Sequence, residues 1–179
     1  MANTNAPNGF VPAWHLTGGV IRADQLAIES TYGTAIYSGD VVTLASGLVT
    51  QGTATAAPCG VFAGVYYVSS TGAPTFSRSW PASTTTQGSV NAKAYVYTDP
   101  DIVYEAQFTT TPTQASVGTT YTISTTTGDT TTLRSKEGVT TTTSSGIARC
   151  LGFVDRPDNS IGQYARGYFI FPASTYGND

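Results

Sequence analysis

The stretch that decides the fold class lies near the end of the chain and reads IARCLGFVDRPDNSIGQYARGYFIF, residues 147–171. Its two apolar limbs, residues 147–154 and 163–171, flank a polar segment of Asp, Arg, Pro, Asn and Ser. Asp, Pro and Asn favour a turn because they preset or hydrogen-bond their own backbone. The pattern therefore predicts an antiparallel β-hairpin.

Short apolar runs broken by turn residues recur back to Tyr32. Residues 32–51 predict a β-meander with strands over 32–37, 41–44 and 48–51, and residues 61–68 and 75–80 predict a second hairpin. A third hairpin is expected from residues 92–97 and 102–108, with Thr98-Asp99-Pro100-Asp101 as its turn. About ten short strands at this spacing predict an all-β protein, an antiparallel β-sandwich or β-barrel whose body covers residues 33–179.

Four other segments between the hairpins give weaker signals. Residues 112–117 could form one helical turn, and residues 121–124 and 131–133 are expected to be short strands. The Thr-rich tract over residues 139–146 has β-propensity but few apolar side chains. It is expected to be either an exposed edge strand or a mobile loop.

The composition excludes several functional classes. Only 11% of the residues are charged, against about 25% in average proteins, whereas 40% are hydrophobic and 11% aromatic. The net charge is -3 and the 8 Lys and Arg residues are scattered, so a phosphate-binding patch for nucleic acid is not expected. No apolar stretch approaches the roughly 18 residues of a membrane helix, and the N-terminus does not resemble a secretory signal.

Residues 1–32 differ from the rest of the chain, because isolated apolar residues stand between Pro, Gly and Asn. Such a segment is not expected to close its own core, so it is either a disordered leader or an extended N-terminal arm. In the second case Phe10, Trp14, Leu16 and Ile21 would be anchors that contact a neighbouring subunit. Deleting residues 1–28 would then leave the melting of the body cooperative.

The residue types of common catalytic and metal sites are sparse. His15 is the only histidine and lies in the segment least expected to fold, so we expect no catalytic residue there. The pairs Asp99/Asp101 and Asp155/Asp158 each bracket a proline, which favours turn chemistry over a glycosidase pair. Asp155, Asp158 and Asn159 also lack the register of a calcium loop. We therefore expect no catalytic residue, no cofactor and no metal.

Cysteines and tyrosines each leave two interpretations open. Cys59 and Cys150 stand in apolar surroundings and are expected to be buried thiols of a chain made in a reducing cytoplasm, with a disulfide as the alternative. The tyrosines expected on strands could pack in a core or interface, or could form a sugar-stacking platform. These tyrosines are Tyr66, Tyr67, Tyr95, Tyr97, Tyr104, Tyr164 and Tyr168.

Several sequence blocks resemble a family of head decoration, or cement, proteins of tailed bacteriophages, especially podoviruses. The blocks are GVFAGV (residues 60–65), SWPA (79–82), AYVYTDPDIVYEAQ (94–107), CLGFVDRPDN (150–159) and Tyr164-Ala165. The resemblance implies a β-sandwich or β-barrel, a homotrimer, and no enzymatic activity. It also implies that the major capsid protein is the partner, with the chain on the outer surface of the virion.

Two functional hypotheses follow. The first is a structural capsid protein that binds across major capsid protein subunits and stabilises the phage head. The alternative is a tail-fibre or receptor-binding module that binds glycans, which would use the tyrosines and the Thr-rich loops. Neither hypothesis involves nucleic acid or a membrane.

Overall fold

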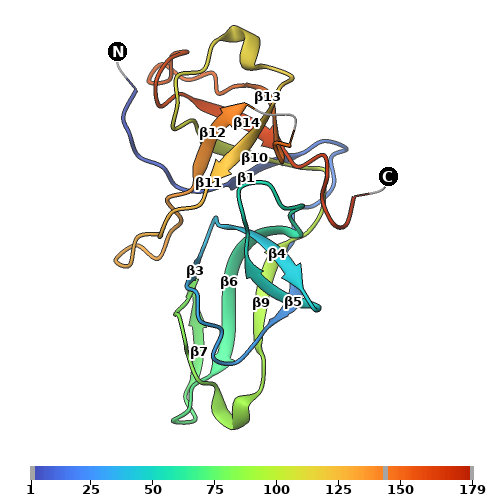
Figure 1. The fold of residues 1–179 in the computed structure, drawn as a ribbon, viewed down its shortest axis with the longest axis vertical. Helices are drawn as coiled ribbons and strands as arrows, with labels where there is room; N and C mark the ends of the chain where they lie inside the picture. Colours follow the sequence, from blue (N-terminus) through green and yellow to red (C-terminus); the bar gives the residue numbers. More distant parts are fainter. Residues whose placement is uncertain (1–2, 143–144, 178–179) are drawn as a thin grey trace.

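The computed structural model describes residues 3–142 and 145–177, and it confirms an all-β protein. Two six-stranded sheets form two lobes stacked along the long axis of the molecule, as Figure 1 shows. The described helical structure consists of two 3-10 turns, η1 (Gln87–Ser89) and η2 (Gln114–Ser116). The second turn lies where one helical turn was expected.

The first lobe, here called the barrel lobe, covers residues 24–97. Its sheet has the order β4-β5-β2-β9-β6-β7, and an additional β4–β6 pairing closes the first five of these strands into a barrel. Trp80, Phe62 and Ile28 are among the fully buried side chains of its core. The strands are β2 (Asp24–Ile28), β4 (Val41–Ala45), β5 (Leu48–Gln51), β6 (Gly60–Val68), β7 (Pro74–Ser77) and β9 (Ala92–Tyr97).

The second lobe, here called the terminal lobe, combines residues 3–22 with residues 98–177. Its sheet has the order β1-β10-β14-β13-β11-β12, and a bridge between Phe108 and Val139 brings β12 back toward the end of β10. Phe10, Tyr104 and Phe169 pack together in its core. The strands are β1 (Val11–His15), β10 (Ile102–Gln107), β11 (Thr120–Ser124), β12 (Gly138–Thr142), β13 (Ala148–Phe153) and β14 (Arg166–Ile170).

The predicted hairpins over β4/β5, β6/β7 and β13/β14 are confirmed, although the limb expected over residues 75–80 ends at Ser77, where β7 ends. The first strand of the predicted meander is wrong, because β3 (Ile36–Tyr37) pairs with β8 (Ser79–Trp80) and not with β4. Residues 131–133 form a turn and not a strand. In the Thr-rich tract β12 lies at one end of the sheet with Val139 buried, while residues 143–144 lie outside the described residues.

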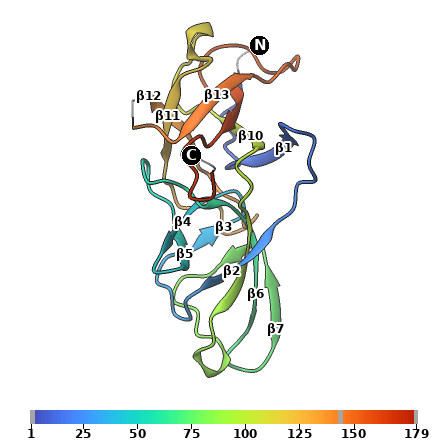
Figure 2. The same cartoon turned by 90° about the vertical axis from the view of Figure 1, so that its right-hand side faces the viewer.

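The predicted hairpin between residues 92–97 and 102–108 is also wrong. Strand β9 belongs to the barrel lobe and β10 to the terminal lobe, so Thr98 to Asp101 connect the two lobes. In Figure 2 the chain leaves β1, runs down to β2 and returns later to β10. Because His15 and Ile102 are register partners in the β1–β10 pair, the barrel lobe is an insertion between two adjacent strands.

Residues 1–32 do not form a separate arm in this structure. Strand β1 pairs with β10 in one lobe, and β2 lies between β5 and β9 in the other. Phe10 is 1% exposed and packs in the chain's own core. The expectation that Phe10 awaits a neighbouring subunit is therefore wrong, because its partners are supplied by β10, β14 and Phe171 of the same chain.

Candidate functional site

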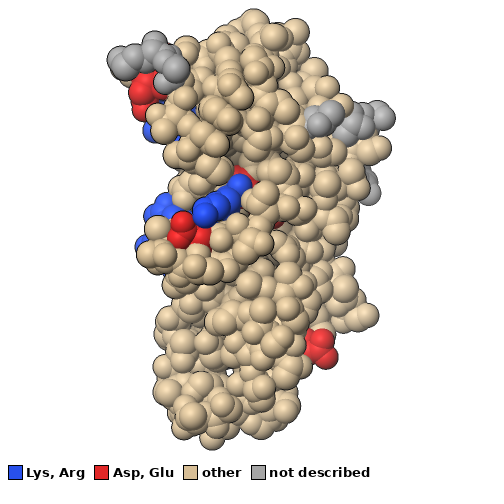
Figure 3. All heavy atoms as spheres, turned by 60° about the vertical axis from the view of Figure 1, so that its left-hand side comes forward, with Lys and Arg blue, Asp and Glu red and all other residues tan. Residues whose placement is uncertain are grey.

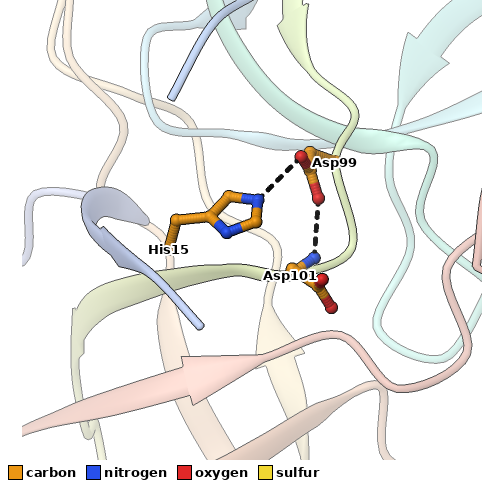
Figure 4. A group of neighbouring side chains, drawn as sticks. All are labelled: His15, Asp99 and Asp101. Carbon is orange, nitrogen blue, oxygen red and sulfur yellow. Dashed lines mark hydrogen bonds and ion pairs between the residues drawn. The ribbon is translucent and has the colours of Figure 1, made fainter. Parts of the chain in front are cut away.

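The neck cluster consists of His15, Asp99 and Asp101, at the point where the chain passes between the lobes (Figure 4). His15 ends β1, and the two aspartates belong to the connection from β9 to β10. His15 Nε2 lies 2.9 Å from Asp99 Oδ2, and the Asp101 N–H donates to Asp99 Oδ1 at 2.9 Å. The three side chains come together because the barrel lobe is inserted between β1 and β10.

Backbone donors fix the tautomer of the His15 ring. The N–H groups of Gly19 and Thr17 donate to His15 Nδ1 at 3.1 and 3.3 Å. Since Nδ1 accepts hydrogen bonds, the ring proton sits on Nε2 and is donated to Asp99. This hydrogen bond is the first cause, and the Asp101 N–H the second, that lower the pKa of Asp99 below its ordinary value of 3.8.

The neck cluster is the one group of imidazole and carboxylate ligands within 4.8 Å of one another that could hold a metal, as far as the described residues go. Its donor set does not fit a metal well. A metal on Nε2 would require the ring proton to move to Nδ1, where it would face the two backbone N–H groups. The geometry instead suits a structural hydrogen bond between the two connections at the neck.

Thr17, His15 and Asp99 are arranged in the order of a catalytic triad of nucleophile, base and acid, but their hydrogen bonds do not suit catalysis. Thr17 Oγ1 lies 3.1 Å from His15 Nδ1, and Asp99 lies on the opposite ring nitrogen. A general base needs a free lone pair directed at the nucleophile. Here the Gly19 and Thr17 N–H groups share that lone pair with the hydroxyl, so the arrangement positions the turn and does not activate Thr17.

Beside the neck cluster lies a cleft of about 380 Å³. Asp24, Thr98 and Asp99 supply polar groups to its wall, which Leu26, Pro100 and Tyr176 also line. Arg22 stands 81% exposed at 3.9 Å from Asp24, a distance at which an exposed ion pair stabilises little. The cleft therefore has acidic and hydroxyl groups at its wall but no buried charge directed into it.

The block with Tyr104, Glu105 and Gln107, the most specific part of the family resemblance, has structural roles in the terminal lobe. Glu105 forms ion pairs with Arg156 and, at 3.2 Å, with Arg166. Gln107 is 1% exposed and accepts the N–H of Ala6 at 3.1 Å. Its amide nitrogen also donates to the carbonyl oxygens of Thr4 and Tyr164 at 2.8 and 3.0 Å, so Gln107 attaches the N-terminal residues to the sheet.

The turn over residues 155–160, which contains Asp155, Asp158 and Asn159, is stabilised by its own backbone contacts. The side chain of Asn159 donates to the carbonyl oxygens of Val154 and Arg166 and accepts the Arg166 N–H at 2.8 Å. Asp155 and Asp158, which both precede Asn159 in the chain, are exposed. The Asn159 oxygen is thus used in the hairpin between β13 and β14, as turn chemistry predicts.

Two fully buried carboxyl groups, here called the junction pair, lie where the lobes meet. Asp40 precedes β4 of the barrel lobe and Glu137 precedes β12 of the terminal lobe, and both are 0% exposed. Asp40 Oδ2 accepts the Tyr37 N–H at 2.7 Å, and Glu137 Oε2 accepts the Val41 N–H at 2.8 Å. Sequence reasoning missed this pair because 96 residues separate Glu137 from Val41.

The expected anchors occupy three different environments. Phe10 is core, and Ile21 is half-buried against the same core. Trp14 packs edge-to-face on Tyr168 at 4.3 Å yet stays 41% exposed, and Leu16 is 50% exposed. Val20 is 85% exposed, and Trp14, Leu16 and Val20, three exposed apolar residues close together in sequence, are here called the β1 patch.

The tyrosines do not form one platform. Tyr104 is buried in the terminal lobe, Tyr67 packs on Trp80 at 5.6 Å in the barrel lobe, and Tyr164 lies in a turn. Tyr66 packs against the exposed Phe76 and, with Tyr67, lines a largely apolar cleft of about 220 Å³ on the barrel lobe. In that cleft Tyr66 and Tyr67 meet polar side chains, among them Asn91 and Lys93.

Comparison of the chain with protein-family models, with curated proteins and with solved structures finds no match. Within residues 3–142 and 145–177, no helix has the length and apolar character needed to cross a bilayer.

Proposed function

We propose that this chain is a structural virion protein that binds the outside of a bacteriophage head across major capsid protein subunits. The observation that carries the proposal is the β1 patch. Trp14, Leu16 and Val20 are large apolar side chains held in solvent by a segment with its own hydrogen bonds, including Leu16 N–H to the Asp101 carbonyl at 2.9 Å. Large apolar side chains that a hydrogen-bonded segment exposes at nearby positions mark a candidate protein-binding site.

The surrounding surface suits the same role. In Figure 3 the charged side chains gather at the waist and at a few separate points, and most of that face of both lobes is uncharged. A surface poor in charge is typical of the centre of a protein interface, where Lys, Asp and Glu are depleted. The block resemblance supports the same conclusion and adds a homotrimer on the head as the expected assembly.

Addition of the purified protein to phage heads that lack it tests this proposal. Leu16→Asp combined with Val20→Asp is expected to weaken attachment to the heads at least about tenfold, because each change places a charge in the buried contact. Val117→Asp combined with Ile161→Asp is the matched control, since these apolar residues are 37% and 49% exposed and belong neither to the β1 patch nor to the cleft beside Tyr66. Equal attachment of both variants would contradict the proposal.

The alternative, a glycan-binding tail-fibre module, is favoured by the cleft beside Tyr66 and Tyr67. Aromatic faces with nearby amide and ammonium groups suit a sugar, and the cleft has Gln87, Asn91 and Lys93 around its rings. Counting copies on intact virions separates the two functions. A copy number near that of the capsid protein supports the cement role, whereas a handful of copies together with glycan binding lost in Tyr66→Ala supports the fibre role.

A further inference from the structure

The junction pair has an unusual hydrogen-bonding state. Asp40 Oδ1 and Glu137 Oε1 are both buried and have no hydrogen-bond partner among the described residues. Each carboxyl group therefore has one satisfied oxygen and one unsatisfied oxygen. A buried polar atom without a partner costs free energy, and it calls for an explanation in any well-packed protein.

Backbone contacts between the lobes bring Asp40 and Glu137 into the same buried region. The Ser135 N–H donates to the Ser38 carbonyl at 2.9 Å, and the Phe10 N–H donates to the Gly39 carbonyl at 2.9 Å. Glu137 binds the N–H of Val41, the residue that follows Asp40. Gly9 makes this approach possible, since a Cβ there would lie 2.5 Å from the Gly39 carbonyl oxygen.

No cation neutralises the pair among the described groups that surround it. Arg134 donates to the Asn8 side chain at 3.1 Å, and Lys136 pairs with Asp129 at 3.4 Å. Tyr37 contributes its backbone N–H, and the Ser135 hydroxyl, which lies beside Asp40, accepts the Glu137 N–H at 3.0 Å. Two ionised carboxylates would therefore repel each other in a site with no opposite charge.

We propose that Asp40 and Glu137 share one proton, which joins their two unpartnered oxygens in a carboxyl–carboxylate hydrogen bond across the junction of the lobes. One carboxyl group donates this proton and the other accepts it, so both remaining oxygens are satisfied by a single hydrogen. Loss of the proton at higher pH leaves two buried negative charges side by side. The junction then loosens, and the two lobes lose part of their mutual support.

The electrostatics of the site agree with this geometry. Burial raises the pKa of Asp40 from 3.8 to about 6, although the Ser135 side chain and the Tyr37 N–H oppose the change. Burial and then the charge of Asp40 raise the pKa of Glu137 well above its ordinary value of 4.5. A carboxyl group whose pKa is raised by folding stabilises the protein below its unfolded pKa and loses that contribution as pH rises through its folded pKa.

A cation is the competing occupant of the site. Calcium requires six to eight oxygen ligands, and here two carboxylate oxygens are without partners in a place that solvent does not reach. A proton needs two oxygens only. The structure thus favours the proton, and a calcium effect becomes one outcome of the test.

Thermal unfolding of the full chain at pH 5 and pH 8 tests the proposal. The melting temperature of the wild type is expected to fall by roughly 5 °C more than that of Glu137→Gln or Asp40→Asn. Either amide supplies an N–H donor that does not titrate, so each variant keeps the cross-junction hydrogen bond at pH 8. Glu29→Gln, which changes an exposed acid, is the matched control and is expected to follow the wild type.

Infrared spectroscopy of the wild-type protein is a second test, and it does not depend on whether a variant folds. The infrared C=O stretch of a protonated carboxyl group is expected in the wild-type protein at pH 7, and it is expected to disappear at alkaline pH. Absence of this band at pH 7, or equal pH dependence in wild type and Glu137→Gln, would overturn the proposal. A rise in melting temperature on adding calcium at pH 8, seen in the wild type and lost in Glu137→Gln, would overturn it in favour of a cation.

Discussion

The two lobes differ in how the chain builds them. Residues 24–97 form the barrel lobe from one continuous segment, and its strands β4, β5, β2, β9 and β6 close on one another. The terminal lobe takes β1 from one end of the chain and β10 to β14 from the other. The terminal lobe therefore depends on the residues up to β1, whereas the barrel lobe uses no strand before β2.

The contacts between the lobes differ as well. The neck cluster is partly exposed, since the Asp99 side chain is 42% exposed, and it joins the covalent connections. The junction pair is fully buried and joins segments that are far apart in sequence. Because folding lowers the pKa of Asp99 and raises the pKa of Asp40 and Glu137, the two contacts are expected to weaken at opposite ends of the pH range.

Deletion of residues 1–28 is expected to have the largest effect of any change considered. It removes β1 from the edge of one sheet, β2 from the interior of the other, and Phe10 from the terminal core. We expect loss of cooperative thermal unfolding, measured by calorimetry, which reverses the expectation from the sequence. A deletion variant that melts cooperatively near the wild-type temperature would show that neither sheet needs these strands.

Phe10→Ala is expected to destabilise the terminal lobe more than the barrel lobe. Removing a buried phenylalanine typically costs about 3–5 kcal/mol, and Phe10 contacts Tyr104, Phe169 and Phe171 of the terminal core. Each lobe contains one buried thiol, Cys59 in the barrel core and Cys150 in the terminal core. Thiol labelling under native conditions is therefore expected to accelerate more at Cys150 than at Cys59.

The matched control for Phe10→Ala is Ile28→Ala. Ile28 is fully buried in the barrel core, on β2. The Ile28→Ala variant should accelerate labelling of Cys59 more than that of Cys150. Equal acceleration at both thiols in both variants would mean that the two lobes unfold as one unit.

Local patterns in the sequence identified the hairpins and failed at the long-range contacts. The β13/β14 hairpin is correct because Asp, Pro and Asn act on their own backbone, which a sequence displays directly. The same residue types at Thr98 to Asp101 predict a hairpin that does not exist, because turn chemistry does not specify which strands then pair. Strand β1 was missed for the same reason, since its partner β10 is supplied from the other end of the insertion.

The candidate sites show the same limit. His15 and Asp99 lie 84 residues apart, and nothing around either residue indicates the other. Glu137 stands in a polar stretch next to Lys136, which suggests an exposed acid and not a fully buried one. By contrast, the burial of Cys59 and Cys150 was predicted correctly, because cysteine in apolar surroundings is a local signal.

His15→Ala is expected to have a smaller effect than Phe10→Ala. It removes the hydrogen bond to Asp99, and since Asp99 is partly exposed to water we expect a loss of about 1 kcal/mol at neutral pH by chemical denaturation. The difference from wild type should shrink as pH falls below the ordinary Asp99 pKa of 3.8 and vanish below the lowered pKa of the folded state, because the protonated carboxyl group no longer needs the donor. Arg22→Ala, beside the same cleft, is the control and should change stability by less than about 0.5 kcal/mol. A difference that persists unchanged at acid pH would assign the effect to packing of the ring.

The smallest expected effect is that of a reductant on thermal unfolding. Both cysteines are free thiols, and they are buried in the cores of different lobes. Burial raises the pKa of Cys59 to about 12 and that of Cys150 to about 11, so both remain protonated and unreactive in the folded protein at neutral pH. The melting temperature should therefore be the same in reducing and oxidising buffer. A disulfide that closed a loop of about 90 residues would stabilise the chain by roughly 4–5 kcal/mol, so a shift of many degrees between the buffers would show that the two lobes can bring these thiols together.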